Sequence, residues 1–426
     1  MPSKPKRQPP ERNNKSSAAN REEILAAVAE SPVSARTVPE KKRSGAGEQK
    51  IDTQGSSTGG PPGNTTGQKI PHYRAPERRK LGLAVGVTIT VLLLAVVAGY
   101  AVVQPRSNRE ENRQDQAAID GAEEPQRVPR RIDGVLDDVE DANRHPVAIM
   151  IENQTAARPQ AGLDKAQVIY EALAEGGITR FLAIYTFPDP ADRIGPVRSA
   201  RPYYVDWARG YDAMYVHIGG SPKAESRIAA SQTFDLNQFF NSQYFFRDQA
   251  LKVASEHTLF TSGKYMTLAL IDKKAPSTGS FTPWSFKDDA PVSERPLEQR
   301  VTIDFSTFSY QVDYAYDRET NDYVRSQAEQ PHVMRDGTQL RAKNVIIVTV
   351  KRRLEQPAEK GRLEMDTIGQ GPAQIVRDGV IVAGTWKKQS LADPLLLLDS
   401  TGQEILLNRG QTWVEVVPPE QEVTVR

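Results

Sequence analysis

The chain has 426 residues, no cysteine, 55 basic and 54 acidic side chains, and a formal net charge of +1. The lack of cysteine excludes disulfides, thiolate metal sites and a lipid-modified cysteine anchor. The balanced charge predicts no nucleic-acid partner. Five histidines without an H-x-x-x-H pair give no metal signature, and no cofactor motif is present, so we expect neither a metal nor a cofactor.

Residues 1–80 hold sixteen Lys or Arg against eight Asp or Glu, a net of +8, and are rich in Pro, Gly and Ser. Such a segment buries too little apolar surface to offset its ordering entropy, which predicts a disordered basic tail. Asn20 and Glu23 have capping-box spacing ahead of an apolar run. This run is either a short helix that folds onto a cytoplasmic protein partner or a transient helix with no role.

Residues 81–103 form an apolar stretch of twenty-three residues without one charge. As a helix it would be about 34 Å long, enough to cross a hydrocarbon core of about 30 Å. A buried core helix is the alternative, but the flanking sequence offers little apolar surface to cover one. The basic tail predicts a cytoplasmic N-terminus, a single membrane span, and residues 104–426 outside the cell membrane.

The polar, proline-containing residues 104–130 predict a flexible linker. Residues 131–285 alternate between apolar runs and amphipathic stretches, which predicts an α/β domain. Strands are predicted at residues 147–151, 168–174, 181–187 and 213–218, and helices at residues 200–209, 222–230 and 264–271.

Residues 286–426 predict a second, mostly antiparallel β domain, because short apolar runs recur with turn signals between them. Asp378-Gly379 and Thr401-Gly402 are typical of hairpin turns, since Gly tolerates positive φ. The predicted strands are residues 301–305, 310–316, 344–350, 373–377, 380–386, 395–399, 404–408 and 412–417.

Four polar interruptions follow or join the strands of the α/β domain, at residues 152–153, 176–180, 195–201 and 217–222. In α/β sheets ligands tend to bind in a crevice at the carboxyl ends of strands, so we expect these segments to converge. The predicted ligand-binding residues are Asn153, Arg180, Arg198, Ser199, Arg201, Gly219, Gly220 and Ser221.

Two of these interruptions suit an anion. Ser221 is a predicted N-cap with Pro222 at the first helical position, so free backbone N–H groups would face a phosphate or carboxylate. Arg198 and Arg201 are three residues apart and would share one helix face if the helix has already begun at Arg198, and their guanidinium groups can grip such an anion. The alternative interpretation is that the arginines pair with acids and the glycines form turns for structural reasons.

His217 and Glu152 are the catalytic candidates. His217 ends an apolar strand and is either a core residue or a general acid or base beside Ser199, Ser221 or a bound anion, with Glu152 orienting it. No G-x-S-x-G motif surrounds either serine, and residues 262–265 lack the spacing of a P-loop.

The runs VIYEALAEGGITRFLAIYTF, IGPVRSARPYYVDWA and YVHIGGSPKA resemble the YerB-like family of bacterial extracytoplasmic proteins, many of which are lipoproteins. The tail, with NVIIVTV, GTWKK and ILLNRGQTWVEVVP, resembles the C-terminal domain of that family, and the likeness covers residues 145–418. The resemblance implies an envelope location and two domains, and it implies no reaction. Met334 stands where the family has an acidic residue, near His332.

Two functional hypotheses follow. The first is a membrane-tethered binding or scaffold protein that holds an anionic envelope ligand through Arg180, Arg198 and Arg201 and contacts a protein partner through the β domain. The second is an enzyme that acts on phosphorylated or glycan envelope material. The plan of a tail, one span and an external α/β domain is also similar to that of the LytR-CpsA-Psr phosphotransferases, which handle polyprenyl-linked glycopolymers.

Overall fold

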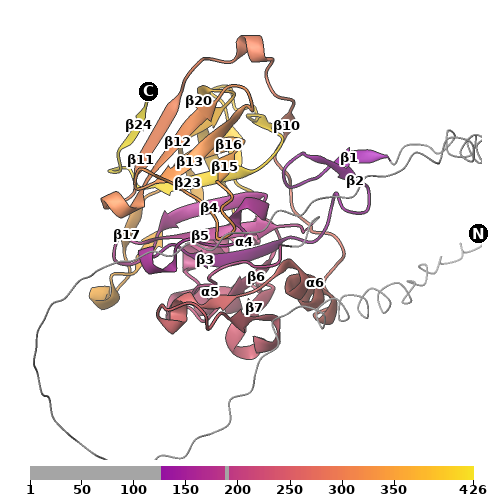
Figure 1. Cartoon of the computed structure of the whole chain (residues 1–426), viewed down its shortest axis with the longest axis vertical. Coiled ribbons are helices and arrows are strands. Elements are labelled where there is room, and N and C mark those ends of the chain that lie inside the picture. The colour runs from indigo at the N-terminus through magenta and orange to yellow at the C-terminus, as the bar shows by residue number, and fades with distance from the viewer. Residues whose placement is uncertain (1–125, 188–190) are drawn as a thin grey trace, which may run out of the picture. The chain divides into compact units, whose positions relative to one another are not determined.

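The computed structural model describes residues 126–187 and 191–426 (Figure 1). The predicted tail, the predicted membrane helix at residues 81–103 and nearly all of the linker lie outside these residues. Across the two described ranges, no helix combines the length and the apolar character that a membrane span requires. The single-span prediction therefore stays a prediction.

A ten-stranded sheet forms the centre of the fold, in the order β21-β20-β19-β16-β23-β4-β5-β3-β6-β7. Its strands are β3 (Val147–Glu152), β4 (Val168–Leu173), β5 (Thr179–Tyr185), β6 (Met214–His217), β7 (Asp235–Asn237), β16 (Asn344–Thr349), β19 (Gly369–Arg377), β20 (Val380–Lys388), β21 (Leu396–Leu398) and β23 (Thr412–Val417). Strands from both sides of the predicted domain boundary at residue 285 thus share one sheet, and that boundary stays a prediction.

Strand direction in the centre of this sheet is mostly parallel. β16 pairs in parallel with β23, β23 with β4, β3 with β6, and β6 with β7, while β5 runs antiparallel between β4 and β3. β3 and β4 are buried along their whole length. Near-continuous apolar runs such as VAIMI suit strands whose two faces are both covered.

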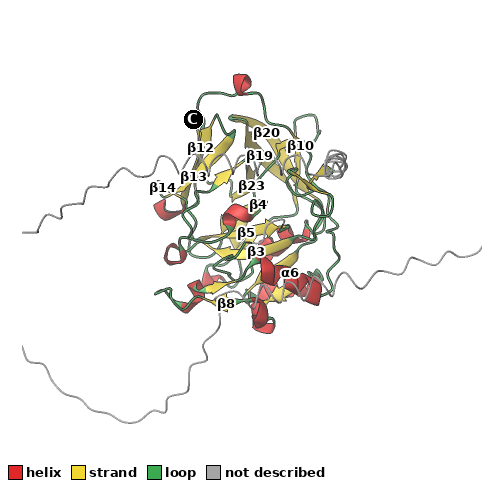
Figure 2. Ribbon diagram, turned by 45° about the vertical axis from the view of Figure 1, so that its right-hand side comes forward, coloured by secondary structure: helices red, strands yellow, loops and turns green. Residues whose placement is uncertain are grey.

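Three α-helices lie around the β3–β7 part of the sheet (Figures 1 and 2), namely α4 (Pro202–Arg209), α5 (Pro222–Ala230) and α6 (Gly263–Asp272). The hydroxyl of Ser221 accepts a hydrogen bond from the backbone N–H of Ala224, and Pro222 is the first residue of α5, as the sequence predicts. α4 begins two residues later than predicted, because Ala200 still bridges to Gly220 and Arg201 is extended.

A second sheet packs on the face of the central sheet opposite α4 and α5, the face that α6 also contacts, and has the order β14-β13-β12-β11-β24, with β15 on β13. Its strands are β11 (Arg300–Asp304), β12 (Gln311–Asp317), β13 (Asp322–Gln327), β14 (Gln330–Pro331), β15 (Arg341–Ala342) and β24 (Val423–Val425). All its pairings are antiparallel. The predicted order, an α/β region followed by an antiparallel β-rich region, is confirmed.

Alternate residues of β3 pack on opposite faces of the central sheet. Val147, Ile149 and Ile151 belong to the core shared with β11–β13 and α6, and Ala148 and Met150 to the core shared with α4. On the α4 side the ring of Trp207 stacks on that of Tyr170, with centroids 5.2 Å apart. This alternation is the two-residue period of a strand.

Several predicted boundaries are wrong. β19 begins four residues earlier than predicted, and the predicted strand at 404–408 is reduced to β22 (Leu407–Asn408). β13 was not predicted because its sequence, DYVRSQ, is mostly polar. Like β14, β15 and β24, the other short strands were not predicted either, namely β1 (Arg127–Pro129), β2 (Leu136–Asp138), β8 (Phe246–Arg247), β9 (Leu259–Phe260), β10 (Phe286–Lys287), β17 (Arg352–Leu354) and β18 (Leu363–Met365).

Both predicted turns occur where strands reverse. Arg377 pairs with Val380 across Asp378 and Gly379, whose φ values of 52° and 71° are those of a type I′ hairpin turn. The second turn lies between Leu398 and Glu404, which form a bridge.

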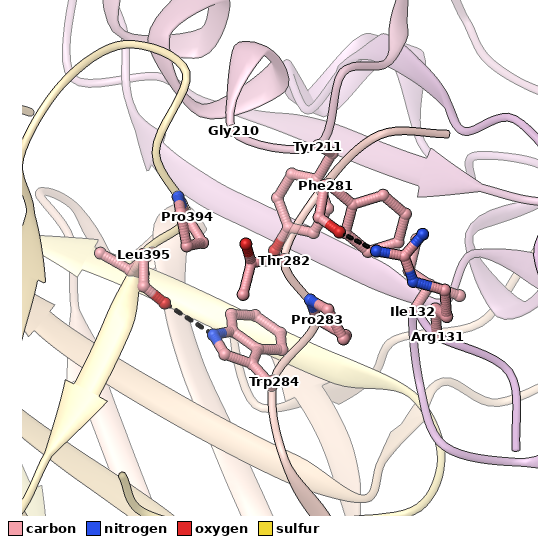
Figure 3. A pocket seen from close by; sticks show the side chains of 10 residues that line it. All are labelled: Arg131, Ile132, Gly210, Tyr211, Phe281, Thr282, Pro283, Trp284, Pro394 and Leu395. Carbon is pink, nitrogen blue, oxygen red and sulfur yellow. Dashed lines mark hydrogen bonds between the residues drawn. The ribbon is translucent and has the colours of Figure 1, made fainter. Parts of the chain in front are cut away.

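The segment that joins the two halves of the chain packs against both of them (Figure 3). The indole N–H of Trp284 donates to the carbonyl of Leu395 at 2.7 Å, and the Arg131 guanidinium donates to the carbonyl of Phe281. The cavity between these residues measures about 10 Å³. That space holds at most about one water molecule, so it is a packing defect and no ligand site.

Candidate functional site

The carboxyl ends of β3, β4 and β6 meet at one edge of the central sheet, because these strands run in the same direction. We call it the carboxyl edge. The segment of residues 195–201 lies along it: the N–H of Glu152 donates to Pro196, and that of Ala200 to Gly219, both at 2.9 Å. The Arg180 guanidinium reaches the carbonyl of Ser199 at 3.2 Å. The structure therefore brings the four predicted polar segments together.

Two of the predicted arginines converge on Glu175, a residue that was not predicted as part of the site. Its carboxylate accepts from Arg180 at 2.6 Å and from Arg201 at 2.9 Å. Burial alone would raise the pKa of Glu175, but the two guanidinium groups outweigh it and hold the pKa at about 2. Glu175 is therefore ionised, and it orients both arginines.

The third predicted arginine, Arg198, pairs with the buried carboxylate of Glu152. The same oxygen lies 3.5 Å from Nδ1 of His257, a buried residue that was also missed. His257 ends a 3-10 turn (Ser255–His257), and nothing in its local sequence marks it. The side chain of Arg198 is 24% exposed, so a ligand from solvent can reach it.

Asn153 holds the loop that follows β3. Its amide donates to Thr179 at 2.7 Å and to Glu171 at 3.2 Å, and its oxygen accepts from Arg158 at 3.1 Å and from Gln160 at 2.9 Å. These bonds use both hydrogens and both lone pairs of the amide, which leaves none for a ligand. Asn153 therefore positions Arg158, and its amide keeps no hydrogen-bonding group free for a ligand.

Arg158 has no carboxylate partner within residues 126–187 and 191–426, and burial lowers its pKa. Its guanidinium donates to the backbone carbonyl and side-chain oxygen of Asn153 and lies over the Tyr310 ring at 5.0 Å. No local sequence pattern marks Arg158 as a functional residue. This arginine adds an unpaired positive charge beside the end of β3.

His217 is buried and does not contact Glu152. Nδ1 lies 2.8 Å from the carbonyl of Gly219, and Nε2 lies 2.6 Å from Asp235. The predicted orientation by Glu152 is wrong, because the parallel pairing of β6 with β7 places Asp235 beside this ring. With both ring nitrogens engaged by the fold, this geometry favours the core-residue interpretation.

The turn of Gly219, Gly220 and Ser221 is less open to an anion than predicted. The N–H of Gly219 donates to Asn237 at 3.1 Å, and that of Ser221 to Ala200 at 3.3 Å. Gly219 has a φ of 55°, and a Cβ there would lie 2.7 Å from the Phe239 ring, which explains the need for glycine. The turn is therefore built to pack against its neighbours.

A groove of about 490 Å³ lies beside the arginines of the carboxyl edge, at the carboxyl ends of β16, β23 and β4. β17 and β18 form one wall, and the turn of Gly176 and Gly177 forms part of the other. The residues that line it are Leu173, Ala174, Gly176, Gly177, Arg352, Arg353, Leu354, Gly361, Leu363 and Glu420. No local sequence pattern marks this groove, because its walls come from segments far apart in the chain.

A buried charged network lies in the core between the two sheets. Glu171 of β4 and Glu415 of β23 are directly opposite each other on neighbouring strands. Arg325 of β13 pairs with Glu171 and donates to the Tyr314 hydroxyl at 3.0 Å, and that hydroxyl in turn bonds to Glu415. Arg325 also lies over the Trp413 ring at 4.4 Å. None of these side chains is accessible to solvent.

His332 belongs to the same network. It contacts the Arg325 guanidinium, and its Nε2 lies 3.1 Å from the side-chain oxygen of Gln160. Burial lowers the pKa of His332 well below its usual value, and the nearby arginine lowers it further. His332 is therefore a neutral core residue that links β13 and β14 to the loop after β3.

The chain resembles known proteins over both halves. Residues 133–277 match the N-terminal domain, and residues 301–414 the C-terminal domain, of a family described as a protein of unknown function, DUF3048. The chain is 31% identical to "Putative lipoprotein YerB" of Bacillus subtilis (strain 168) over 278 residues, which are 65% of this chain and 82% of that protein. The chain belongs to this family.

The crystal structure of the YerB protein from Bacillus subtilis has a related fold, with a TM-score of 0.61 and 28% identity. The match covers 69% of this chain and 98% of that one. In this DUF3048 protein the groove draws on both matched regions, because residues 173–177 lie in the first and residues 352–363 in the second. The predicted YerB-like resemblance is confirmed.

Proposed function

We propose that this protein is a cell-envelope protein, held in the membrane by residues 81–103, whose carboxyl edge binds an anionic ligand outside the cell. The name of its relative, "Putative lipoprotein YerB", supports a membrane-associated extracytoplasmic location. The apolar stretch at residues 81–103 would supply the anchor in a chain that has no cysteine.

The excess of positive charge at the carboxyl edge carries the proposal. Arg180 and Arg201 share one carboxylate, Glu175, and Arg198 shares Glu152 with His257. Arg158 adds a fourth guanidinium, so four cations face two carboxylates. A phosphate or carboxylate ligand would balance this excess, and Arg198 is exposed enough to meet it.

Thermal unfolding of the full-length protein in detergent tests this proposal. The probes are inorganic phosphate, a polyprenyl phosphate and a muropeptide. A probe at a hundredfold its dissociation constant stabilises the folded state by about 2.7 kcal/mol, which shifts Tm by several degrees. We expect the shift in the wild type and its loss in Arg198→Gln, each measured against the same protein without probe.

Arg341→Gln is the matched control. Arg341 is also a partly exposed, ion-paired arginine, but it precedes β16 and so lies at the opposite edge of the sheet. The control should keep the full shift. An equal shift in Arg198→Gln and the wild type, or no shift with any of the three probes, would contradict an anion site at the carboxyl edge.

The contact between Glu152 and His257 supports a second candidate, an enzyme that acts on phosphorylated or glycan envelope material. A carboxylate beside an imidazole can move a proton, and the neighbouring arginines can stabilise negative charge as it develops.

Incubating the full-length protein with a polyprenyl-linked glycan phosphate tests this alternative. We expect products whose rate depends on pH and falls at least about 100-fold in His257→Ala. His217→Ala serves as the comparison, since that ring faces Asp235. Turnover that is equal in His257→Ala and the wild type would eliminate the acid–base role.

A further inference from the structure

We propose that the groove beside β17 binds an extended peptide from another protein as an additional β-strand. The residues that line the groove are different from the four arginines of the proposed anion site, so this inference does not rest on the proposed function. Figure 1 shows β17 at one end of the central sheet, near β4 and β5.

The topology leaves a strand position vacant. β23 lies between β16 and β4 and ends at Val417, after which the chain turns away, with the N–H of Gln421 bonded to Pro418. The chain after β16 continues in line, since the N–H of Val350 donates to Val417 at 2.8 Å before β17 begins. The path of β23 is thus open beyond Val417, between β17 and the end of β4.

The residues that line the groove also indicate a vacant strand position beyond the end of β23. It contains all three residues of β17 and, across from them, Leu173 and Ala174 at the end of β4. Glu420, three residues past the end of β23, closes one side. The groove therefore lies where β23 would continue.

The wall formed by β17 is an unpaired strand edge. The N–H of Glu355 donates to Arg362, and that of Asp366 to Lys351. In an antiparallel pair only alternate residues bond to the partner strand, so Arg353 also faces β18 while the backbone groups of Arg352 and Leu354 face away. In the described part of the chain, no backbone hydrogen bond involves these outward groups. An edge of this kind is a template for another strand.

The side chains around the groove favour an apolar peptide over an ion. Leu354 and Leu363 contribute apolar surface, and Leu354 is 51% exposed. Arg352 pairs with Glu420 at 3.0 Å and Arg353 with Asp366 at 2.6 Å, so the arginines of the wall are already neutralised. The volume is within the range of ligand pockets. Backbone bonds would hold the peptide, and leucines would receive its alternate side chains.

Amide hydrogen exchange of the full-length protein in detergent, labelled with ¹⁵N-arginine and ¹⁵N-leucine, tests this inference. The probe is a pool of capped pentapeptides made of Ala, Val, Leu and Thr. At a concentration about tenfold above its dissociation constant, the pool should slow exchange at Arg352 and Leu354 about tenfold. Arg353 is the internal control, because its N–H faces β18 and should not respond.

Two comparisons make the test specific. A pool with N-methyl groups on alternate residues cannot complete the strand ladder and should give no protection. Leu354→Pro removes an outward donor without touching a bond to β18, and it should abolish the protection of Arg352. Exchange at Arg353 in this variant shows whether the β17–β18 hairpin remains folded. If the hairpin is unfolded in the variant, the comparison with the N-methylated pool decides whether the peptide pairs as a strand.

Three results would overturn the inference. The first is unchanged exchange at Arg352 and Leu354 with the pool at millimolar concentration. The second is equal protection by the N-methylated pool, which would indicate burial without strand pairing. The third is protection that appears without peptide and grows with protein concentration, which would assign the edge to a second copy of the chain.

Discussion

Replacing Arg325 by methionine should lower the free energy of unfolding by about 3–5 kcal/mol, the usual cost of leaving a buried charge without its partner. Arg325 and Glu171 are both inaccessible to solvent and form an ion pair. Methionine fills much of the same volume, but it leaves the Glu171 carboxylate uncompensated in the core. It also removes a donor to the Tyr314 hydroxyl.

Chemical denaturation of the full-length protein in detergent measures this loss. Arg341→Met is the matched control, because Arg341 pairs with two aspartates at the surface and should cost less than about 1 kcal/mol. Adding Glu171→Gln to Arg325→Met should recover part of the stability, since the unpaired charge is then gone. Equal losses for Arg325→Met and Arg341→Met would show that the buried pair contributes nothing special.

Replacing Glu415 by glutamine should remove a pH dependence of stability between about pH 5 and pH 8. Burial and the neighbouring Glu171 carboxylate raise the pKa of Glu415 to about 8, although Arg325 opposes this. In the unfolded chain the same carboxyl has a pKa of about 4.3. Between these two values the folded protein holds a proton that the unfolded chain has released.

Because the folded state binds more protons in this window, stability falls as pH rises through it. The contribution of Glu415 is fully present below the unfolded pKa and is lost as pH rises through the folded pKa. Each pH unit changes the free energy of unfolding by at most about 1.4 kcal/mol, which gives roughly 2–4 kcal/mol between pH 5 and pH 8.

Denaturation curves of the wild type and Glu415→Gln at several pH values measure this effect, and their difference isolates Glu415. Other groups act in the opposite direction: burial lowers the pKa of His145 and of His332, so their contributions favour stability as pH rises. Such groups are common to both proteins and cancel in the difference. A difference that stays constant from pH 5 to pH 8 would contradict the raised pKa.

The sequence by itself determined most of the local structure. Apolar runs located β3, β4, β5 and β6, and Ser221 with Pro222 located the start of α5, because strand period and helix capping are local properties. The convergence of the polar segments also followed from sequence, since parallel strands bring their carboxyl ends to one edge. The sequence motifs alone also identified the YerB-like family to which the chain belongs.

Only the tertiary structure decided which side chains are partners. Glu171 and Arg325 are 154 residues apart in the chain, and the sheet and its covering strands bring them together. The carboxylates of Glu175 and Glu152 pair with the predicted arginines and so limit how far those arginines are available to a ligand. No local sequence pattern marks either pairing. The same holds for the strand-wide groove beside β17, because its walls lie in both halves of the chain. Local sequence controls backbone conformation through short-range sterics and hydrogen bonds, whereas ion pairs and grooves depend on distances that exist only after long-range packing.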